Sequence, residues 1–139
     1  MIVTVTLNPS IDRTAPIAGP LRRGQVNRLG SSTEVAAGKG VNISRVLRGA
    51  GIETCAVVPA GAKGRLTLGL NHDDIPHQVV PVAAAVRTNL TITEPDGITT
   101  KINEPGADLS PEELTAVEEA IVEKSSGAQW VVLSLSLIH

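Results

Sequence analysis

Short apolar runs alternate with stretches of helical periodicity along much of the chain. Runs that are rich in β-branched residues and bounded by turn-forming residues predict strands, at residues 2–7, 53–59, 78–82 and 129–135. Helices are predicted between them, at residues 36–51, after Gly61-Ala62-Lys63-Gly64 through Leu70, and from 110 to about 124. Strands that alternate with helices indicate parallel βαβ units, so the sequence predicts an α/β fold.

The first and last of these helices have the clearest signals. In the segment 36–51, the apolar stripe expected to face the core consists of Ile43, Val46, Leu47 and Ala50. The last helix opens with Ser110-Pro111-Glu112-Glu113. Ser110 can accept hydrogen bonds from the exposed amides, Pro111 suits the first helical position, and Glu113 completes a capping box.

Polar segments that do not fit a parallel sheet predict a second, smaller β-layer. Residues 86–93 and 98–102 flank the turn signal Glu94-Pro95-Asp96-Gly97 and therefore predict a β-hairpin. The polar stretch 14–34 contains a short predicted strand at 25–29. We expect the segments at about 14–34 and 86–102 to form a β-sheet lid on the main sheet.

Composition narrows the class of partner. Trp130 is the only aromatic residue, which argues against the stacking that single-stranded nucleic acid requires. The net charge of -2 gives no general attraction to nucleic acid or to an anionic membrane. Between residues 12 and 48, however, seven Lys and Arg residues stand against two acidic residues. This basic third suits a small anionic ligand or, equally, a solvated basic surface.

Nothing in the sequence predicts export or membrane insertion. The single cysteine, Cys55, cannot form an internal disulfide. No apolar stretch approaches the ~20 residues of a membrane span, and the first residues form a predicted strand without the basic region of a signal peptide. We therefore expect a cytoplasmic protein.

The segment Ala37-Gly38-Lys39-Gly40-Val41-Asn42 lies where a loop becomes a helix. Glycines let a ligand approach the backbone, while the helix amides and Lys39 attract an anion. The segment is not a Walker A motif, because Gly40 rather than Ser or Thr follows Lys39, and it lacks a dinucleotide fingerprint. From this segment alone, two interpretations stay open: an anion-binding site, and glycines that only mark the start of a helix.

Two further side chains are candidates for ligand contacts. Asp12 follows the first strand, at the end where open α/β sheets bind ligands, and it can accept hydrogen bonds from sugar hydroxyls or cap a turn. Arg87 opens a hairpin strand, and its guanidinium can hold a phosphate bidentately or stay solvated. The histidines have no ligand spacing, so no metal site is predicted at His72, His77 and His139.

Taken in order, these motifs resemble those of the ribokinase-like (PfkB-type) carbohydrate kinases. The similar segments cover nearly the whole chain: Thr6-Leu7-Asn8-Pro9-Ser10-Ile11-Asp12, 37–47, Val86-Arg87-Thr88-Asn89-Leu90, 101–106 and 130–134. The family's first signature is Gly-Gly-Lys-Gly-x-Asn, and Ala37 replaces its first glycine here. Segments 24–28 and 102–106 look like the 1-phosphofructokinase branch, and tagatose-6-phosphate kinases and 6-phosphofructokinases are similar enough to stay open.

The resemblance implies a parallel sheet flanked by helices, a small β-sheet lid, and a site for a phosphorylated ketohexose. Asp12 would hold sugar hydroxyls, and Arg87 would reach the substrate phosphate from the lid. The other implied contacts to the sugar and its phosphate are Gly38, Lys39, Asn42 and Ser136. The lid often pairs two subunits in such enzymes, which implies a homodimer. The implied reaction is phosphorylation of D-fructose 1-phosphate to fructose 1,6-bisphosphate by ATP with Mg²⁺.

The sequence departs from the family pattern at its end. Leu135 replaces a glycine of the segment Ser-Gly-Ser-Leu-Pro-Pro-Gly, and Ile138-His139 stand where Pro-Pro belongs. The family's Gly-Ala-Gly-Asp motif with its general-base Asp, its Asn-x-x-Glu magnesium motif and its nucleotide pocket belong to a C-terminal half. We therefore expect this chain alone to be an inactive truncated portion that binds neither ATP nor Mg²⁺ fully. The alternatives are a related phosphosugar kinase and a non-catalytic sugar-phosphate-binding remnant.

Overall fold

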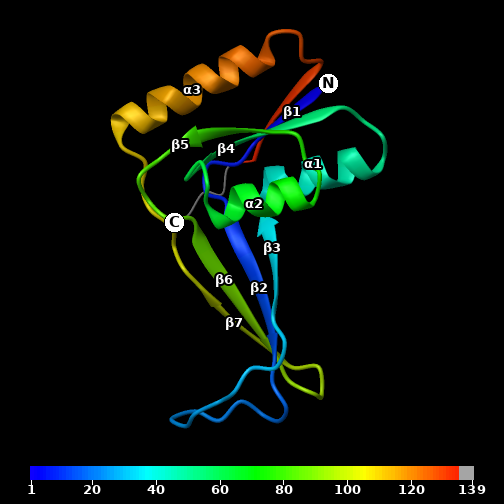
Figure 1. Ribbon diagram of the computed structural model, residues 1–139, viewed down its shortest axis with the longest axis vertical. Helices are drawn as coiled ribbons and strands as arrows, with labels where there is room; N and C mark the ends of the chain where they lie inside the picture. The colour runs from blue at the N-terminus through cyan, green and yellow to red at the C-terminus, as the bar shows by residue number, and fades with distance from the viewer. Residues whose placement is uncertain (135–139) are drawn as a thin grey trace.

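The computed structural model describes residues 1–134, and its main sheet is parallel and lies between helices (Figure 1). The strand order is β5-β4-β1-β8, with β1 at Ile2–Val5, β4 at Thr54–Ala60, β5 at His77–Pro81 and β8 at Trp130–Leu133. The helices are α1 (Lys39–Gly49), α2 (Arg65–His72) and α3 (Pro111–Ser125). All neighbouring strands of this sheet pair in parallel, which confirms the predicted α/β class.

Strand β1 runs through the middle of the main sheet, and its side chains alternate between two helical layers. Val3 and Val5 are fully or almost fully buried in a cluster that includes Val117 of α3. Thr4 points to the other face, where its hydroxyl contacts α1. The buried hydrophobic residues on both faces are aliphatic, as expected of a chain with one aromatic residue.

Helix α1 buries a different face from the one that the sequence predicts. Its buried residues are Gly40, Val41 and Ser44. The side chain of Val46, by contrast, is 72% exposed. The whole predicted stripe is half-buried or exposed: Ile43, Val46, Leu47 and Ala50. The prediction is wrong because it places the face with most apolar side chains against the sheet. In the structure the face that contacts the sheet carries the small polar residue Ser44.

A chain of buried hydroxyls explains why Ser44 faces the sheet. Oγ1 of Thr54 donates to the carbonyl of Ile2 at 2.9 Å, so its hydrogen is already used. Ser44 must then donate to Thr54, at 2.9 Å, and Thr4 donates to Ser44 at 2.7 Å. Every hydroxyl in the chain has a partner, so its burial carries no unpaired polar group.

The strand β8 forms an edge of the main sheet in the described residues and pairs with β1 alone. Its sequence is apolar throughout, as predicted, but its side chains are largely uncovered. Trp130 is 71% exposed and Leu133 is 58% exposed. An apolar strand pattern thus predicts the strand here, but not its burial.

A second sheet projects from the main body (Figure 1). Its strand order is β3-β2-β6-β7, with β2 at Ser10–Pro16, β3 at Thr33–Ala37, β6 at Arg87–Thr93 and β7 at Thr99–Asn103. β6 and β7 form the predicted hairpin. In its turn, the amide of Gly97 donates to the carbonyl of Glu94 at 3.0 Å, and Gly97 has φ 89, a backbone conformation that favours glycine.

The strands β2 and β3 differ from the sequence-based expectation. The predicted strand at 25–29 is absent from the described structure, and in that segment only Leu29 forms an isolated bridge, with Ile17. β3 includes Ala36 and Ala37, which the helical pattern assigns to α1. Pairing rather than local pattern defines these strands, because β2 pairs with β3 over residues 10–14 and with β6 over residues 10–16.

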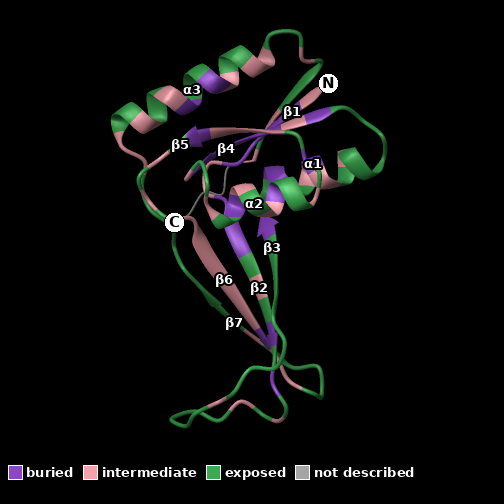
Figure 2. Ribbon diagram, in the orientation of Figure 1, coloured by how far each residue is buried: buried purple, intermediate pink, exposed green. Residues whose placement is uncertain are grey.

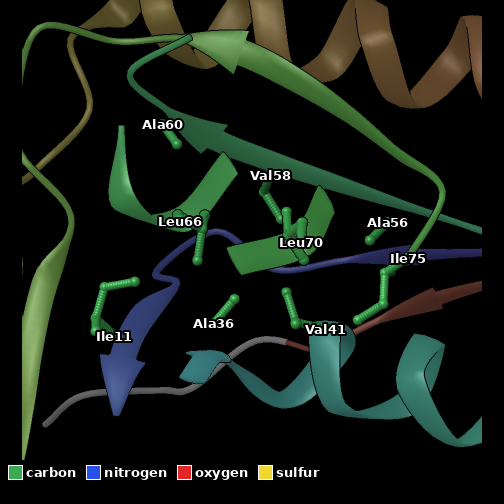
Figure 3. Packing of buried hydrophobic residues seen from close by; sticks show 9 residues of the cluster. All are labelled: Ile11, Ala36, Val41, Ala56, Val58, Ala60, Leu66, Leu70 and Ile75. Atoms are coloured by element: carbon green, nitrogen blue, oxygen red, sulfur yellow. The ribbon is translucent and has the colours of Figure 1, made fainter. Parts of the chain in front are cut away.

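The two sheets share one hydrophobic cluster. Ile11 of β2 and Ala36 of β3 are buried among aliphatic residues of α1, α2 and β4 (Figure 3). Arg65, at the start of α2, also donates to Glu34 of β3 at 2.5 Å, and this contact holds the pKa of Glu34 below its ordinary value. The loops at the far end of the second sheet are mostly exposed (Figure 2). The sheet is therefore anchored at the end that carries Asp12.

Helix α3 begins with the predicted capping box. Oγ of Ser110 accepts from the amide of Glu113 at 3.1 Å, and Oε2 of Glu113 accepts from the amide of Ser110 at 2.9 Å. Oε1 of Glu113 also accepts from the amide of Ala83 at 2.8 Å, which ties α3 to the segment after β5. The amides of Ser110 and Ala83 hold the pKa of the Glu113 carboxyl below its ordinary value.

We expect mild acid to remove this contribution of Glu113 to stability. A carboxyl whose pKa is lower in the folded state stabilises the fold above its unfolded pKa of about 4.3. That stabilisation is lost as pH falls through the lower folded pKa. Urea unfolding at pH 7 and below pH 4 should show that Glu113→Gln loses stability at pH 7 and little at acid pH. The control Glu118→Gln, on the exposed part of α3, should change little at either pH. Equal losses at both pH values would contradict the expected role.

Candidate functional site

A pocket of about 150 Å³ opens where β1 ends, α1 begins and β6 begins. Residues from distant parts of the chain line it: Thr6, Leu7, Asn8, Gly38, Lys39, Arg87 and Ser134. The carboxyl ends of the parallel strands β1 and β8 lie at this position, which is where open α/β sheets bind ligands. The pocket brings together three of the residues singled out in the sequence, namely Gly38, Lys39 and Arg87.

Two glycines allow the start of α1 to lie directly on β1. Gly38 has φ 132, and a Cβ there would lie 2.5 Å from Cγ2 of Thr6. A Cβ on Gly40 would lie 2.5 Å from Oγ1 of Thr6 and 2.7 Å from the carbonyl oxygen of Val5. The helix has no side-chain cap of its own. Instead, Oγ1 of Thr6 accepts from the amide of Val41 at 3.1 Å.

The beginning of α1 presents positive charge to the pocket. The first amides of a helix have no acceptor within the helix, and the helix dipole adds partial positive charge there. Thr6 satisfies the amide of Val41, and Gly38 and Lys39, which precede it in this turn, line the pocket. Lys39 adds a full charge at the same place. None of the ion pairs formed within residues 1–134 uses Lys39 or Arg87.

Backbone carbonyls position the guanidinium of Arg87. Nη2 donates to the carbonyl of Asn8 at 3.3 Å, and Nη1 donates to the carbonyl of Glu104 at 3.4 Å. Nε is buried and has no partner within residues 1–134. Both recorded bonds are long, so the guanidinium is held in place without a strong acceptor. It can therefore still bind a stronger one, such as a phosphate oxygen.

The loop after β1 also contacts the loop after β7. Nδ2 of Asn8 donates to the carbonyl of Pro105 at 3.0 Å. Gly106 follows with φ 91, and an added Cβ there would overlap the Asn8 amide. These contacts hold Asn8, which lines the pocket with Arg87, against the loop after β7.

Asp12 lies outside the lining of the pocket, on β2 and directly opposite Asn89 of β6. Its Oδ1 accepts from Oγ of Ser10 at 2.9 Å and from Nδ2 of Asn89 at 3.0 Å. Ser10 is paired with Arg87. Asp12 is two residues further along β2, on the same face of the sheet as the arginine of the pocket. The arrangement places a hydrogen-bond acceptor beside an anion-attracting pocket.

The other predicted site residues are placed less directly. Asn42 is exposed on α1, and its Oδ1 accepts from Nη1 of Arg45 at 2.8 Å. It does not line the pocket. Ser136 lies outside the described residues, whereas Ser134, two positions earlier, does line the pocket.

Sequence reasoning gave no role to Asn8, Ser134 or Asn89. Two signals could have found them. Asn8 and Ser134 each follow a strand of the parallel sheet, at the end where Asp12 was already expected to act. Asn89 is two residues after Arg87 on a strand, and residues two apart share a face.

The described residues offer little support for other chemistry. In residues 1–134 no group of three or more His, Cys, Asp and Glu side chains could hold a metal ion. Burial raises the pKa of the Cys55 thiol, which makes it a poor nucleophile at neutral pH. No helix in this part of the chain has the length and apolarity to cross a membrane.

No family model matches the chain, but individual proteins do. It is 31% identical over 98% of its length to the 1-phosphofructokinase of Vibrio cholerae, and 35% identical over 97% of its length to that of Xanthomonas campestris. It spans 43% of the length of each of these curated relatives. A solved structure of Escherichia coli phosphofructokinase-2 with fructose-6-phosphate matches 96% of the chain at 28% identity and a TM-score of 0.86. In sequence and fold, the chain is therefore similar to the N-terminal part of PfkB-type sugar kinases.

The PfkB-type resemblance includes both sheets. The match to the solved E. coli chain covers 44% of that chain and 96% of this one, so it includes nearly all residues of both sheets. A structure of the tetrameric inhibited form of the same E. coli protein matches at 29% identity, with a TM-score of 0.87, over 98% of this chain and 45% of that one. The family resemblance inferred from the motifs is therefore confirmed.

Proposed function

We propose that the protein is a 1-phosphofructokinase and that residues 1–139 form the sugar-phosphate side of its active site. The proposed reaction transfers the γ-phosphoryl group of ATP to the 6-hydroxyl of D-fructose 1-phosphate and yields fructose 1,6-bisphosphate. The observation that carries the proposal is the pocket in which Lys39, Arg87 and the first turn of α1 direct positive charge into one small volume. The names of both curated relatives support the choice of phosphosugar.

The proposed roles follow from the chemistry of each side chain. Lys39 attracts the sugar phosphate as a point charge, and Arg87 binds it as a planar fork. Gly38 and its neighbours let the phosphate approach the backbone amides. Asp12 accepts hydrogen bonds from the sugar hydroxyls. Two further contacts to the sugar and its phosphate complete the proposed set, Asn42 and Ser136.

ATP and Mg²⁺ belong to the proposed reaction of the whole enzyme. When bound, ATP supplies the phosphoryl group and Mg²⁺ neutralises the charge on it. The described residues contain no cluster of His, Cys, Asp and Glu that fits a metal ion, so we assign no Mg²⁺ ligand among them. We propose that the C-terminal half implied by the family resemblance binds both and supplies the general base.

We propose further that the second sheet is a lid over the sugar and a homodimer surface in a cytoplasmic enzyme. Asp12 and Asn89 lie on one polar face of this sheet, which supports a role in covering a hydroxyl-rich ligand. Exclusion of water by a closed lid strengthens contacts to the phosphate. Light scattering over a range of concentrations tests the dimer, and a monomer at every concentration would contradict it.

The purified chain should bind fructose 1-phosphate more tightly than fructose 6-phosphate or tagatose 6-phosphate. A titration followed by phosphorus NMR, which detects weak binding, measures all three ligands under the same conditions. A preference for fructose 6-phosphate would favour a 6-phosphofructokinase, in line with the E. coli structure solved with that ligand. Binding no tighter than that of inorganic phosphate would contradict a sugar-phosphate site.

The same purified chain should show no fructose 1-phosphate-dependent ATP turnover. Phosphoryl transfer depends on positioning the nucleotide, its metal ion and the nucleophile, and residues 1–134 present no cluster that holds the metal ion. A coupled ADP assay measures turnover. Activity that requires fructose 1-phosphate would refute the expectation, whereas binding without turnover is also the result for a non-catalytic sugar-phosphate-binding remnant.

A further inference from the structure

Asp12 is held through one oxygen of its carboxylate. Oγ of Ser10 donates to Asp12 Oδ1 at 2.9 Å, and Nδ2 of Asn89 donates to the same oxygen at 3.0 Å. Within residues 1–134 no side-chain or backbone donor is recorded on Oδ2. Hydrogen bonds to an ionised carboxylate are stronger than those between neutral groups. Two of them on Oδ1 restrict rotation of the carboxylate and leave Oδ2 to an incoming donor.

The pairing of β2 with β6 places Asn89 for this contact. The strands are parallel, with Asp12 opposite Asn89 and Ser10 opposite Arg87. Paired residues project from the same face of a sheet, and so do residues two apart on one strand. Asn89 therefore lies on the face of the sheet that carries both Asp12 and the proposed phosphate ligand Arg87.

The side-chain amide of Asn89 directs its nitrogen toward Asp12, and its oxygen is left without a hydrogen bond in the described part of the chain. Its Oδ1 is buried and has no hydrogen-bond partner within residues 1–134. Turning the amide over would set Oδ1 against the carboxylate, so the charge of Asp12 determines the orientation. An unpaired buried polar atom costs free energy, so packing alone does not explain an asparagine at this position. The amide is thus explained by its bond to Asp12.

We propose that Asn89 is a positioning residue which, together with Ser10, orients Asp12 so that Oδ2 accepts a hydrogen bond from a hydroxyl of the sugar. This inference rests on the proposed sugar-binding role of Asp12. Phosphate alone contacts Lys39 and Arg87, whereas a phosphorylated ketohexose also contacts Asp12. Asn89 therefore controls how strongly the site prefers the phosphosugar to phosphate.

The test compares the affinities of the full chain for fructose 1-phosphate and for inorganic phosphate. Asn89→Ala should weaken fructose 1-phosphate binding about tenfold, the effect of one hydrogen bond to a charged group, and leave phosphate binding unchanged. Asn89→Asp, which keeps the shape, should show the same selective loss at pH 7 because two adjacent carboxylates repel. The matched control is Thr91→Ala, on the same strand and face but opposite Thr14. It should change neither affinity.

Circular dichroism identifies any variant that fails to fold, and if Asn89→Ala does not fold, Asn89→Asp decides. An affinity ratio that stays unchanged in the folded variants would overturn the inference. So would equal losses for both ligands, because that result indicates a general disturbance of the sheet. If the unmodified chain does not prefer fructose 1-phosphate to phosphate, the sugar-binding role of Asp12 fails and the inference fails with it. Only this last result counts against the proposed function.

Discussion

Alanine in place of Gly40 is expected to lower the free energy of unfolding by about 3 kcal/mol and to abolish ligand binding at the pocket. The added Cβ would lie 2.5 Å from Oγ1 of Thr6 and 2.7 Å from the carbonyl oxygen of Val5. Because Val5 belongs to a strand paired on both sides, the helix rather than the strand must move. Such a shift breaks the bond from the amide of Val41 to Thr6 and displaces the amides of the first turn.

Urea unfolding followed by circular dichroism measures the loss of stability, and titration with fructose 1-phosphate measures the loss of binding. Gly49 at the end of the same helix provides a control, because no atom lies within 4 Å of an added Cβ there. Gly49→Ala should be neutral or raise stability by up to about 1 kcal/mol, since alanine favours helices more than glycine does. A similar loss in both variants would contradict the close-approach explanation.

Substitution of Arg87 should cause a large loss of ligand affinity without a comparable loss of stability. Arg87→Ala should weaken fructose 1-phosphate binding about 100-fold, because it removes charge-assisted hydrogen bonds to the phosphate. Arg87→Lys should recover only part of this, since lysine restores the charge but not the planar fork. The existing bonds of Arg87 to two carbonyls are long, at 3.3 and 3.4 Å, so the fold loses little.

Arg13 is the matched control for this experiment. It belongs to β2 and lies one residue from Asp12, so its side chain projects from the opposite face, where it contacts Ser32. Arg13→Ala should leave the affinity for fructose 1-phosphate within about twofold of the unmodified chain, because a partly exposed charge on the opposite face contributes little. An equal loss in the Arg13 and Arg87 variants would mean that net charge, and not a specific contact, attracts the phosphate.

The elements that the sequence predicts well are those specified by neighbouring residues. The capping box at Ser110 needs only residues within one turn of α3, and the hairpin needs only its turn. The parallel strands are predictable because β1 and β4 are apolar runs. Some residues that line the pocket are predictable for a similar reason, since Lys39 and Arg87 each belong to a short local motif.

The elements that the sequence predicts poorly depend on distant partners. Ser44 is a polar residue by pattern, and it becomes a core residue through the hydroxyls of Thr4 and Thr54. β2 shows no strong strand pattern and forms because two other strands pair with it. The role inferred for Asn89 requires the register between β2 and β6, which no single segment of the sequence contains.

The exposed position of Trp130 on β8 determines how this chain can be followed optically. Trp130 is the sole aromatic residue, so all aromatic fluorescence of the chain comes from one edge of the main sheet. An indole that is 71% exposed in the native state changes its surroundings little on unfolding, so its emission is a weak signal of denaturation. The same indole becomes a sensitive reporter when another polypeptide segment covers that edge. A blue shift on mixing would then detect association with β8 directly, without a label.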